Sequence, residues 1–83
     1  MGKTIRVLFF AAARELAGTD KTRITLDPDA TTAELRIAIA FQYPALGDTI
    51  STITLALNQE YLEEESPLRD GDEVALIPPI SGG

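Results

Sequence analysis

The sequence of 83 residues contains no cysteine and no histidine. Without cysteine the chain can form no disulfide, no thiolate metal site and no cysteine nucleophile. The lack of histidine removes the commonest general base and the commonest metal ligand of proteins. Any chemistry at this chain therefore has to use carboxylates, lysines, hydroxyl groups or the ends of the chain.

Basic residues are also few, with 7 Lys and Arg against 13 Asp and Glu and a net charge of −6. Such a surface repels phosphate backbones, so we expect no binding to nucleic acid. It favours partner proteins with basic surfaces and would speed their encounter at low salt. Alternatively, the charge only keeps a small domain soluble.

Long apolar runs are missing as well, since none approaches the roughly 18 residues needed to span a bilayer. The first residues, Met1 to Thr4, do not have the pattern of a signal peptide, and Arg6 stands where a myristoylation motif needs Ser or Thr. We therefore expect a cytoplasmic protein that does not contact the membrane. No internal repeat and no linker divides the chain.

Period-two alternation of β-branched and aliphatic residues predicts three strands, at residues 4–10, 22–26 and 53–57, and an apolar run predicts a fourth at residues 73–77. A short strand at Tyr61-Leu62 is expected to pair beside the third, which stops near Asn58-Gln59. The last segment, EVALI, is apolar on both faces of the strand, which is typical of a central strand in a covered sheet. Asp70-Gly71-Asp72 before it predicts a tight turn.

Helix signals occupy two places in the sequence. Residues 11–16 are strong helix formers that end near Gly18, so they predict one or two turns. Thr31 and Glu34 have the spacing of a capping box, which predicts a helix from Thr32 to about Tyr43, ended by Pro44. The expected buried face of this helix consists of Leu35, Ala38, Ile39 and Gln42.

One main helix crossing a mixed sheet of four or five strands is the ubiquitin-like β-grasp plan, an α+β fold. We expect the β-grasp domain to occupy residues 1–77 and an extended, flexible C-terminal tail to occupy residues 78–83. Pro78 and Pro79 stiffen the start of this tail and cannot continue the sheet. The residues beyond them could reach about 16 Å, which is enough to enter a partner's pocket.

The tail ends in Gly82-Gly83. Residues without Cβ can thread a narrow channel and leave the terminal carboxylate accessible for attack on a phosphate. A C-terminal pair of glycines arises by chance in about one chain in 200. The sequence therefore indicates that the carboxylate of Gly83 is the working group.

Two segments, VLFFAAARELAGTD (residues 7–20) and DGDEVALIPPISGG (residues 70–83), resemble the small subunit of molybdopterin synthase, the MoaD-type sulfur carrier. The resemblance includes the Asn58-Gln59 corner and the Pro67-Leu68 step and covers nearly the whole chain, with the middle helix the least diagnostic part. It implies that Gly83 is adenylated by an E1-like enzyme that uses ATP and Mg²⁺. A persulfide sulfurtransferase would then displace AMP and leave a thiocarboxylate.

The resemblance also implies the destination of the sulfur. In the large subunit of molybdopterin synthase, the thiocarboxylate would donate sulfur to the cyclic pyranopterin monophosphate precursor in molybdenum cofactor biosynthesis. The expected assembly is a heterotetramer of two small and two large subunits. The small chain would be a sulfur donor without catalytic groups or a bound cofactor of its own, active only with the large subunit.

The family docks an apolar patch onto its partners, which the resemblance places at Phe10, Tyr61 and Ile77. The tail residues Pro78, Pro79, Ile80, Ser81 and Gly82 would enter the partner together with Gly83. Leu8 and Phe10 on the outward face of the first strand, and Ile77 just before the tail, point to this patch, although Leu8, Phe9 and Val74 are alternatively expected to pack in the core.

Several charged residues have less specific interpretations. Arg14 could pair with an acidic group of a partner or be solvated, and Glu63 to Glu65 form a solvated loop or steer toward a basic partner. We assign no role to Lys3 or Lys21.

Three other functions remain compatible with the sequence. The related carrier for thiazole synthesis also ends in Gly-Gly but is usually shorter and lacks the Pro-Pro-Ile-Ser approach. A ubiquitin-like modifier would join Gly83 to lysines, and a β-grasp binding module would leave the tail idle. The chemistry at Gly83 distinguishes them.

Overall fold

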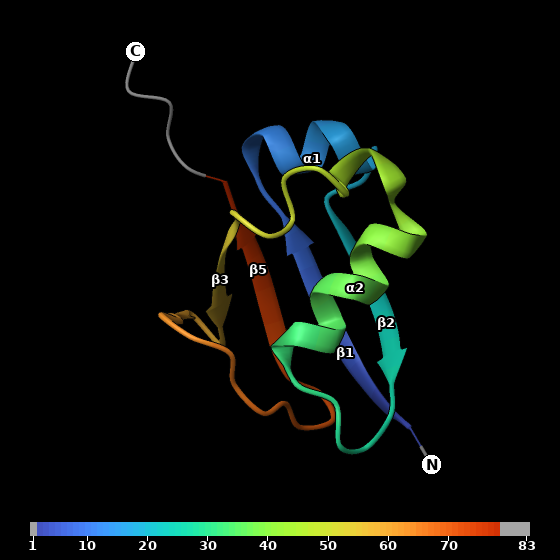
Figure 1. The fold of residues 1–83 in the computed structure, drawn as a ribbon, viewed down its shortest axis with the longest axis vertical. Coiled ribbons are helices and arrows are strands. Elements are labelled where there is room, and N and C mark those ends of the chain that lie inside the picture. Colours follow the sequence, from blue (N-terminus) through green and yellow to red (C-terminus); the bar gives the residue numbers. More distant parts are fainter. Residues whose placement is uncertain (1, 79–83) are drawn as a thin grey trace.

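The computed structural model describes residues 2–78. In chain order the elements are β1 (Lys3–Phe9), α1 (Ala11–Ala17), β2 (Lys21–Leu26), α2 (Thr32–Gln42), the 3₁₀ turn η1 (Pro44–Leu46), β3 (Thr54–Leu57), β4 (Glu60–Tyr61) and β5 (Glu73–Ile77), as Figure 1 shows. No helix within residues 2–78 has the length and apolar character that crossing a membrane requires.

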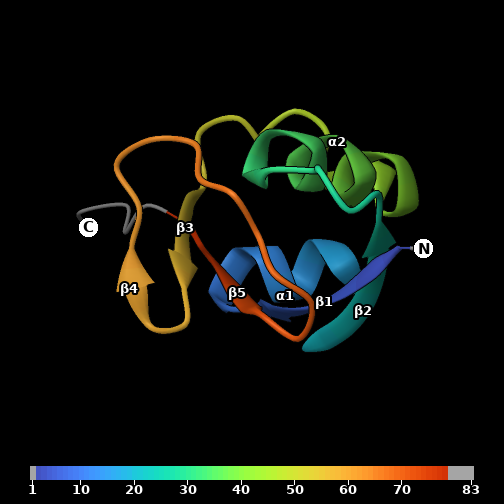
Figure 2. The ribbon, with the colours of Figure 1, turned by 90° about the horizontal axis from the view of Figure 1, so that it is seen from below.

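The five strands form one mixed sheet in the order β2-β1-β5-β3-β4. β5 lies at its centre, parallel to β1 and antiparallel to β3. A parallel pair needs a crossover connection, and the chain between β1 and β5 supplies it through α2, which lies over one face of the sheet (Figure 2). This is the ubiquitin-like β-grasp, so the predicted fold class and the central position of the last strand are confirmed.

The core fills the space between α2 and the sheet. Alternate side chains point to the same face of a strand, so every second residue of β1 and β5 enters it. Fully or almost fully buried members on these elements are Ile5, Val7, Phe9, Leu35, Ile39, Val74 and Leu76. Phe9 meets Tyr43 edge to face, with ring centroids 5.2 Å apart and an interplanar angle of 70°.

The start of α2 follows the predicted capping box. Thr31 Oγ1 accepts from the Ala33 N–H at 3.2 Å, and the Glu34 carboxylate accepts from the Thr31 N–H at 3.1 Å and from its hydroxyl at 2.5 Å. The helix ends at Gln42, before Pro44. The prediction that Gln42 shares the buried face is wrong, because the chain turns into η1 there and Leu46 fills the core instead.

Strand boundaries also differ slightly from the prediction. Ile53 is buried but lies outside β3. Its N–H donates to the Thr49 carbonyl at 3.1 Å, and its carbonyl accepts from Arg36 Nη1 at 2.9 Å. Leu62 lies just after β4 and packs against the core. Phe10 is the N-cap of α1 and no longer part of β1.

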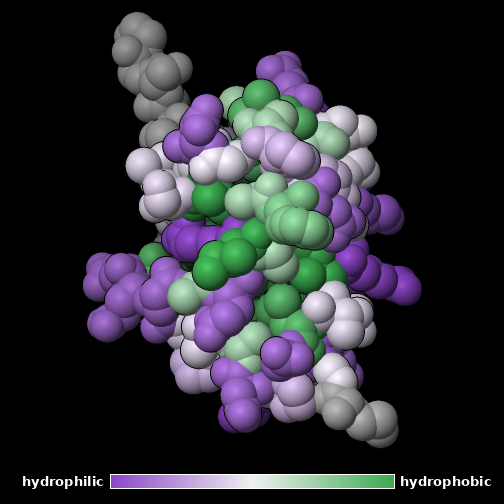
Figure 3. All heavy atoms as spheres, turned by 45° about the vertical axis from the view of Figure 1, so that its right-hand side comes forward, coloured by the Kyte–Doolittle hydropathy of each residue, from purple (hydrophilic) through white to green (hydrophobic). Residues whose placement is uncertain are grey.

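The outer surface of α2 carries two large apolar side chains that stay outside the core. Ile37 is 70% exposed and Phe41 is 88% exposed. Figure 3 shows apolar side chains gathered on the side of the molecule that carries α2. No pattern in the sequence pointed to either residue.

Within residues 2–78, only one face of the sheet is covered. Ala75 and Ile77 alternate with the buried Val74 and Leu76, yet both are only half-buried. The prediction of a covered sheet is therefore wrong for residues 2–78, where both helices lie on the core side. We call the other side the open face.

Candidate functional site

A row of side chains crosses the open face from one edge strand to the other. The strand registers pair Lys21 with Leu8, Leu8 with Ala75, Ala75 with Ala56, and Ala56 with Tyr61. All five residues lie on the same side because the pairing conserves the alternation of the strands. The row is cationic at β2, apolar across the middle and aromatic at β4.

Two of the predicted docking residues lie on this face. Tyr61 ends the row and is 70% exposed. Ile77 lies two residues after Ala75 on β5, so both point to the open face, and Ile77 pairs with Thr54 of β3. Phe10 is 47% exposed and directly follows Phe9, the partner of Leu76. It therefore lies at the end of the sheet where β5 also ends.

The expected core positions are only partly confirmed. Phe9 and Val74 are buried, but Leu8 is half-buried and lies on the open face outside the core cluster. Leu8 therefore adds apolar surface to the row that leads to Tyr61.

Pro78 begins the predicted tail and is the last described residue. It is half-buried and lines a hollow of about 280 Å³ together with Ala12, Leu16 and Ile53. The predicted site residues Pro79, Ile80, Ser81, Gly82 and Gly83 lie outside the described residues. The division into 1–77 and 78–83 stays a prediction, although β5 ends at Ile77.

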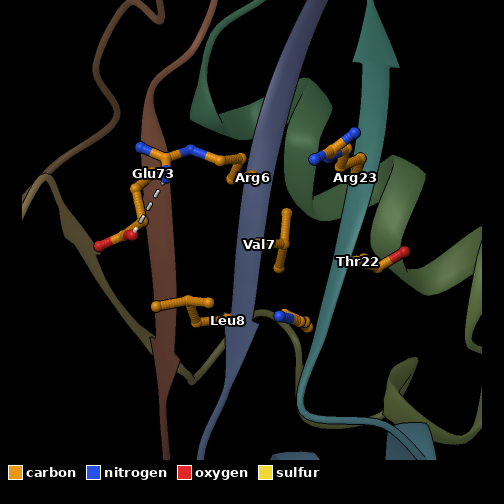
Figure 4. Close-up of a pocket in the computed structure, with 7 residues that line it drawn as sticks. Arg6, Val7, Leu8, Thr22, Arg23 and Glu73 are labelled. Carbon is orange, nitrogen blue, oxygen red and sulfur yellow. Dashed lines mark ion pairs between the residues drawn. The ribbon is translucent and has the colours of Figure 1, made fainter.

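A groove lies beside the row, over β1 and β2 (Figure 4). It has a volume of about 540 Å³, and its lining includes Arg6, Lys21, Arg23 and Glu73. The Arg6 guanidinium lies 3.8 Å from the Glu73 carboxylate and donates to the Gly71 carbonyl at 3.4 Å. Sequence spacing does not reveal this cluster, because Arg6 and Arg23 become neighbours only through the register of β1 with β2.

Lys3, to which the sequence assigned no role, has a structural one. Its side chain is 7% exposed, and its ammonium group donates to the carbonyls of Pro28, Ala30 and Leu68. A buried lysine needs such partners, since desolvation of an unpaired charge is costly. The residue joins three segments of the core side and does not reach the open face.

The other predicted charged residues lie elsewhere. Arg14 is exposed in the last turn of α1. Glu63, Glu64 and Glu65 are all exposed, as expected of a solvated loop, and Glu65 also accepts from the Thr32 hydroxyl at 2.8 Å and pairs with Arg36 at 3.4 Å. Hydrogen bonds from the hydroxyl and N–H of Thr31 lower the pKa of Glu34, which caps α2.

Within residues 2–78, no group of three or more potential metal-ligating side chains could hold a metal ion. The open face combines apolar contact area with exposed cations on β1 and β2, where Arg6 pairs with Glu73 at the start of β5. Its arrangement suits protein recognition rather than acid–base chemistry.

Comparison with known proteins identifies the family. A model described as the ThiS family matches residues 7–83, a range that includes the two terminal glycines. The chain belongs to the ThiS family.

Relatives and solved structures extend this ThiS-family assignment. The molybdopterin synthase sulfur carrier subunit of Chlamydomonas reinhardtii is 46% identical over 81 residues, which cover 95% of this chain and 98% of that protein. The crystal structure of SAMP1 from Haloferax volcanii superimposes with a TM-score of 0.87 at 31% identity, covering 96% of this chain and 99% of that one. A complex of subunits 1 and 2 of the molybdopterin-converting factor from Helicobacter pylori contains a chain with a TM-score of 0.69 at 30% identity. The match covers 96% of this chain and 99% of that one.

Proposed function

We propose that this chain is the sulfur-carrier small subunit of molybdopterin synthase. The observation that carries the proposal is the near-full-length similarity to a protein of that name, at 46% identity over 95% of the chain. The match to the ThiS family continues through Gly82 to Gly83, whose carboxylate would carry the sulfur.

The proposed chemistry takes place at the carboxylate of Gly83. A carboxylate oxygen attacks the α-phosphorus of ATP on an adenylating enzyme, which forms the acyl-adenylate and releases pyrophosphate. The terminal sulfur of an enzyme persulfide then attacks the carbonyl carbon, and AMP leaves. A thiol finally cleaves the S–S bond as a disulfide forms, which leaves the thiocarboxylate on Gly83.

The folded domain would position this end for its partners. Gly83 is six residues beyond Ile77, the last residue of the central strand. Because β5 is fixed between β1 and β3, the origin of the tail is defined relative to the open face. For a partner that binds Tyr61, Ile77 and Phe10, the start of the tail would therefore have a fixed position relative to the bound surface.

The partner proposed for this surface is the large subunit of molybdopterin synthase, in an assembly of two small and two large chains. The Helicobacter pylori complex of subunits 1 and 2 supports a partner of this class. The proton-transfer groups and the groups that bind the precursor's phosphate would belong to the large subunit.

Addition of one alanine after Gly83 tests the proposal. The extended and unextended chains are incubated with ATP, Mg²⁺, a sulfur source and the adenylating enzyme, and their intact masses are measured. The unextended chain should gain about 16 Da from the exchange of oxygen for sulfur, a covalent change at its terminus. The extended chain should gain nothing and should not support sulfuration of the pterin precursor.

A control chain carries the same alanine at its N-terminus and should behave like the unextended protein. If the chain with alanine after Gly83, or one without Gly83, still supports normal sulfuration, the proposal is wrong.

The similarity to SAMP1, whose solved structures include one described as a small archaeal modifier protein, favours one other function, attachment to proteins. Adducts between Gly83 and lysine side chains, in place of a free thiocarboxylate, would support it. A thiocarboxylate that forms but is not used by the large subunit would instead support a carrier for thiazole synthesis.

A further inference from the structure

Three of the seven basic residues of this acidic protein lie together on the open face. Arg6, Lys21 and Arg23 line the groove over β1 and β2, which we call the basic groove (Figure 4). All three side chains are exposed. Because the net charge of the protein is −6, this group of three cations is a local exception on an acidic molecule.

The basic groove is not explained by stability. Arg6 lies directly opposite Arg23 in the antiparallel pair, and like charges in this position destabilise a sheet. Glu73 neutralises Arg6, at 3.8 Å, but the side chains of Lys21 and Arg23 make no ion pair within residues 2–78. The sheet therefore keeps two exposed cations that its own acidic residues do not neutralise.

The groove is continuous with the apolar row that leads to Tyr61. Leu8 belongs to both, because it lines the groove and pairs with Ala75 of the row. Lys21 begins the row and also lines the groove. A protein that covers the apolar part of the open face would thus reach the basic groove without leaving the surface.

The backbone around the groove favours a protein ligand over a small anion. Residues 3–8 of β1 and 21–26 of β2 are paired with each other in the ladder. Phosphate sites usually use free backbone N–H groups, as at helix N-termini and nests, whereas here only mobile side chains would hold the ion. An extended acidic segment can instead contact several of these cations at once.

The spacing of the cations defines the segment. Lys21 and Arg23 are two residues apart on one strand, so they repeat at about 7 Å on the same face. Carboxylates at alternate positions of an extended chain have the same spacing. β2 is an edge strand, and its free side leaves room for such a segment among the described residues.

We propose that the partner protein docked on the open face presents an acidic extended segment, with carboxylates at alternate positions, to Lys21 and Arg23, the two cations of the groove that Glu73 does not neutralise. The inference rests on the proposed function, since it takes the large subunit as this partner. Charges of this kind mainly raise the rate of association and fix the orientation of the complex. The groove would thereby select acidic partners although the chain as a whole is acidic.

Charge reversal in the groove tests the proposal. Association of purified large subunit from the same organism is followed by stopped-flow measurements for wild type, Lys21→Glu and Arg23→Glu, at low and at physiological salt. We expect each reversal to slow association by about tenfold at low salt, and less at physiological salt where screening is stronger. Arg23→Lys should keep a rate close to that of wild type.

Arg69→Glu is the matched control, because it makes the same charge change at an exposed residue outside the groove. It should slow association less than twofold if the groove acts locally, an estimate for a charge outside the interface. Equal slowing by Arg69→Glu and Arg23→Glu would overturn the proposal in favour of a general charge effect. Thermal unfolding of each variant checks that the fold is intact.

Two further results separate the possible failures. If wild type forms the thiocarboxylate and binds the large subunit while Arg23→Glu binds equally fast, the groove proposal alone is wrong. If wild type neither forms the thiocarboxylate nor binds, the proposed function is wrong. Saturable shifts of the Lys21 and Arg23 amide signals with inorganic phosphate, together with unchanged association rates for the variants, would overturn the proposal in favour of a small-anion site.

Discussion

The ammonium group of Lys3 donates to the carbonyl of Leu68 at 2.6 Å, across 65 residues of sequence. The same nitrogen donates to Ala30 at 2.7 Å and to Pro28 at 2.9 Å. One side chain thereby joins the first strand to the loop before α2 and to the loop before β5. These loops precede two of the elements that enclose the core.

Replacement of Lys3 by methionine should destabilise the fold by about 2–3 kcal/mol. Methionine keeps much of the apolar stem but leaves buried carbonyl groups without a donor, and each such loss costs about 1–3 kcal/mol, partly recovered where water enters. Urea unfolding would measure the effect. Lys21→Met is the control, because Lys21 is exposed, and it should change the free energy of unfolding by less than about 0.5 kcal/mol. Equal effects of the two variants would contradict the role given to Lys3.

Glu34→Gln should change how stability depends on pH. The hydrogen bonds from Thr31 hold the folded-state pKa of Glu34 below its ordinary value of 4.5. Its ionised form therefore adds stability that is fully present above the unfolded-state pKa and is lost as the pH falls through the folded-state pKa.

The measurement is the difference in unfolding free energy between wild type and Glu34→Gln over a series of acidic pH values. Wild type should be more stable near neutrality, and the difference should shrink as the pH falls. A difference that stays constant from neutral to strongly acidic pH would mean that the charge of Glu34 is not involved. The other carboxylates titrate in both proteins, so their contributions largely cancel.

Asn58 combines a left-handed backbone, with φ of 49°, with two side-chain hydrogen bonds. Its amide donates to Asp72 at 3.1 Å and accepts from the Glu73 N–H at 3.0 Å. Asn58→Gly should lose about 1 kcal/mol from these bonds, while Asn58→Ala should lose about 2 kcal/mol because alanine also disfavours the left-handed region.

Gln59 serves as the control for this corner, since its φ is 74° and its side chain makes no hydrogen bond within residues 2–78. Gln59→Gly should stabilise the fold slightly or leave it unchanged. Denaturant midpoints of the three variants give the order. If Asn58→Gly is less stable than Asn58→Ala, the backbone argument is wrong.

Tyr61 and Phe41 are both exposed aromatic residues, but they lie on different surfaces. Tyr61 is on the open face, and Phe41 is an exposed residue of α2, the helix that covers the opposite face of the sheet (Figure 2). Tyr61→Ser should weaken binding to the large subunit by about 1–2 kcal/mol, or roughly 5- to 30-fold in Kd, as expected for an aromatic contact residue.

Phe41→Ser should leave that Kd unchanged within about twofold, since a residue outside an interface contributes little to affinity. Isothermal titration calorimetry with the large subunit would compare the two. A larger loss for Phe41→Ser than for Tyr61→Ser would mean that the partner binds over α2 and not on the open face.

Local patterns predicted most of the secondary structure correctly. The capping box of Thr31 and Glu34 located the start of α2, and the apolar run EVALI after the Asp70-Gly71-Asp72 turn gave the limits of β5 without error. Both are short-range effects, set by hydrogen bonds or side-chain directions within a few residues. Gln42 was misplaced because the helix period says nothing about where the chain turns away from the core.

The sequence by itself determined the β-grasp order of elements and the absence of cysteine and histidine side chains, while the tail at residues 78–83 stays a prediction. These follow from residue types and their local spacing. Only the tertiary structure decided that Lys3 is buried among three carbonyls and that Arg6 faces Arg23. Such neighbours are created by strand register and chain crossing, and these long-range pairings depend on the packing of the whole core.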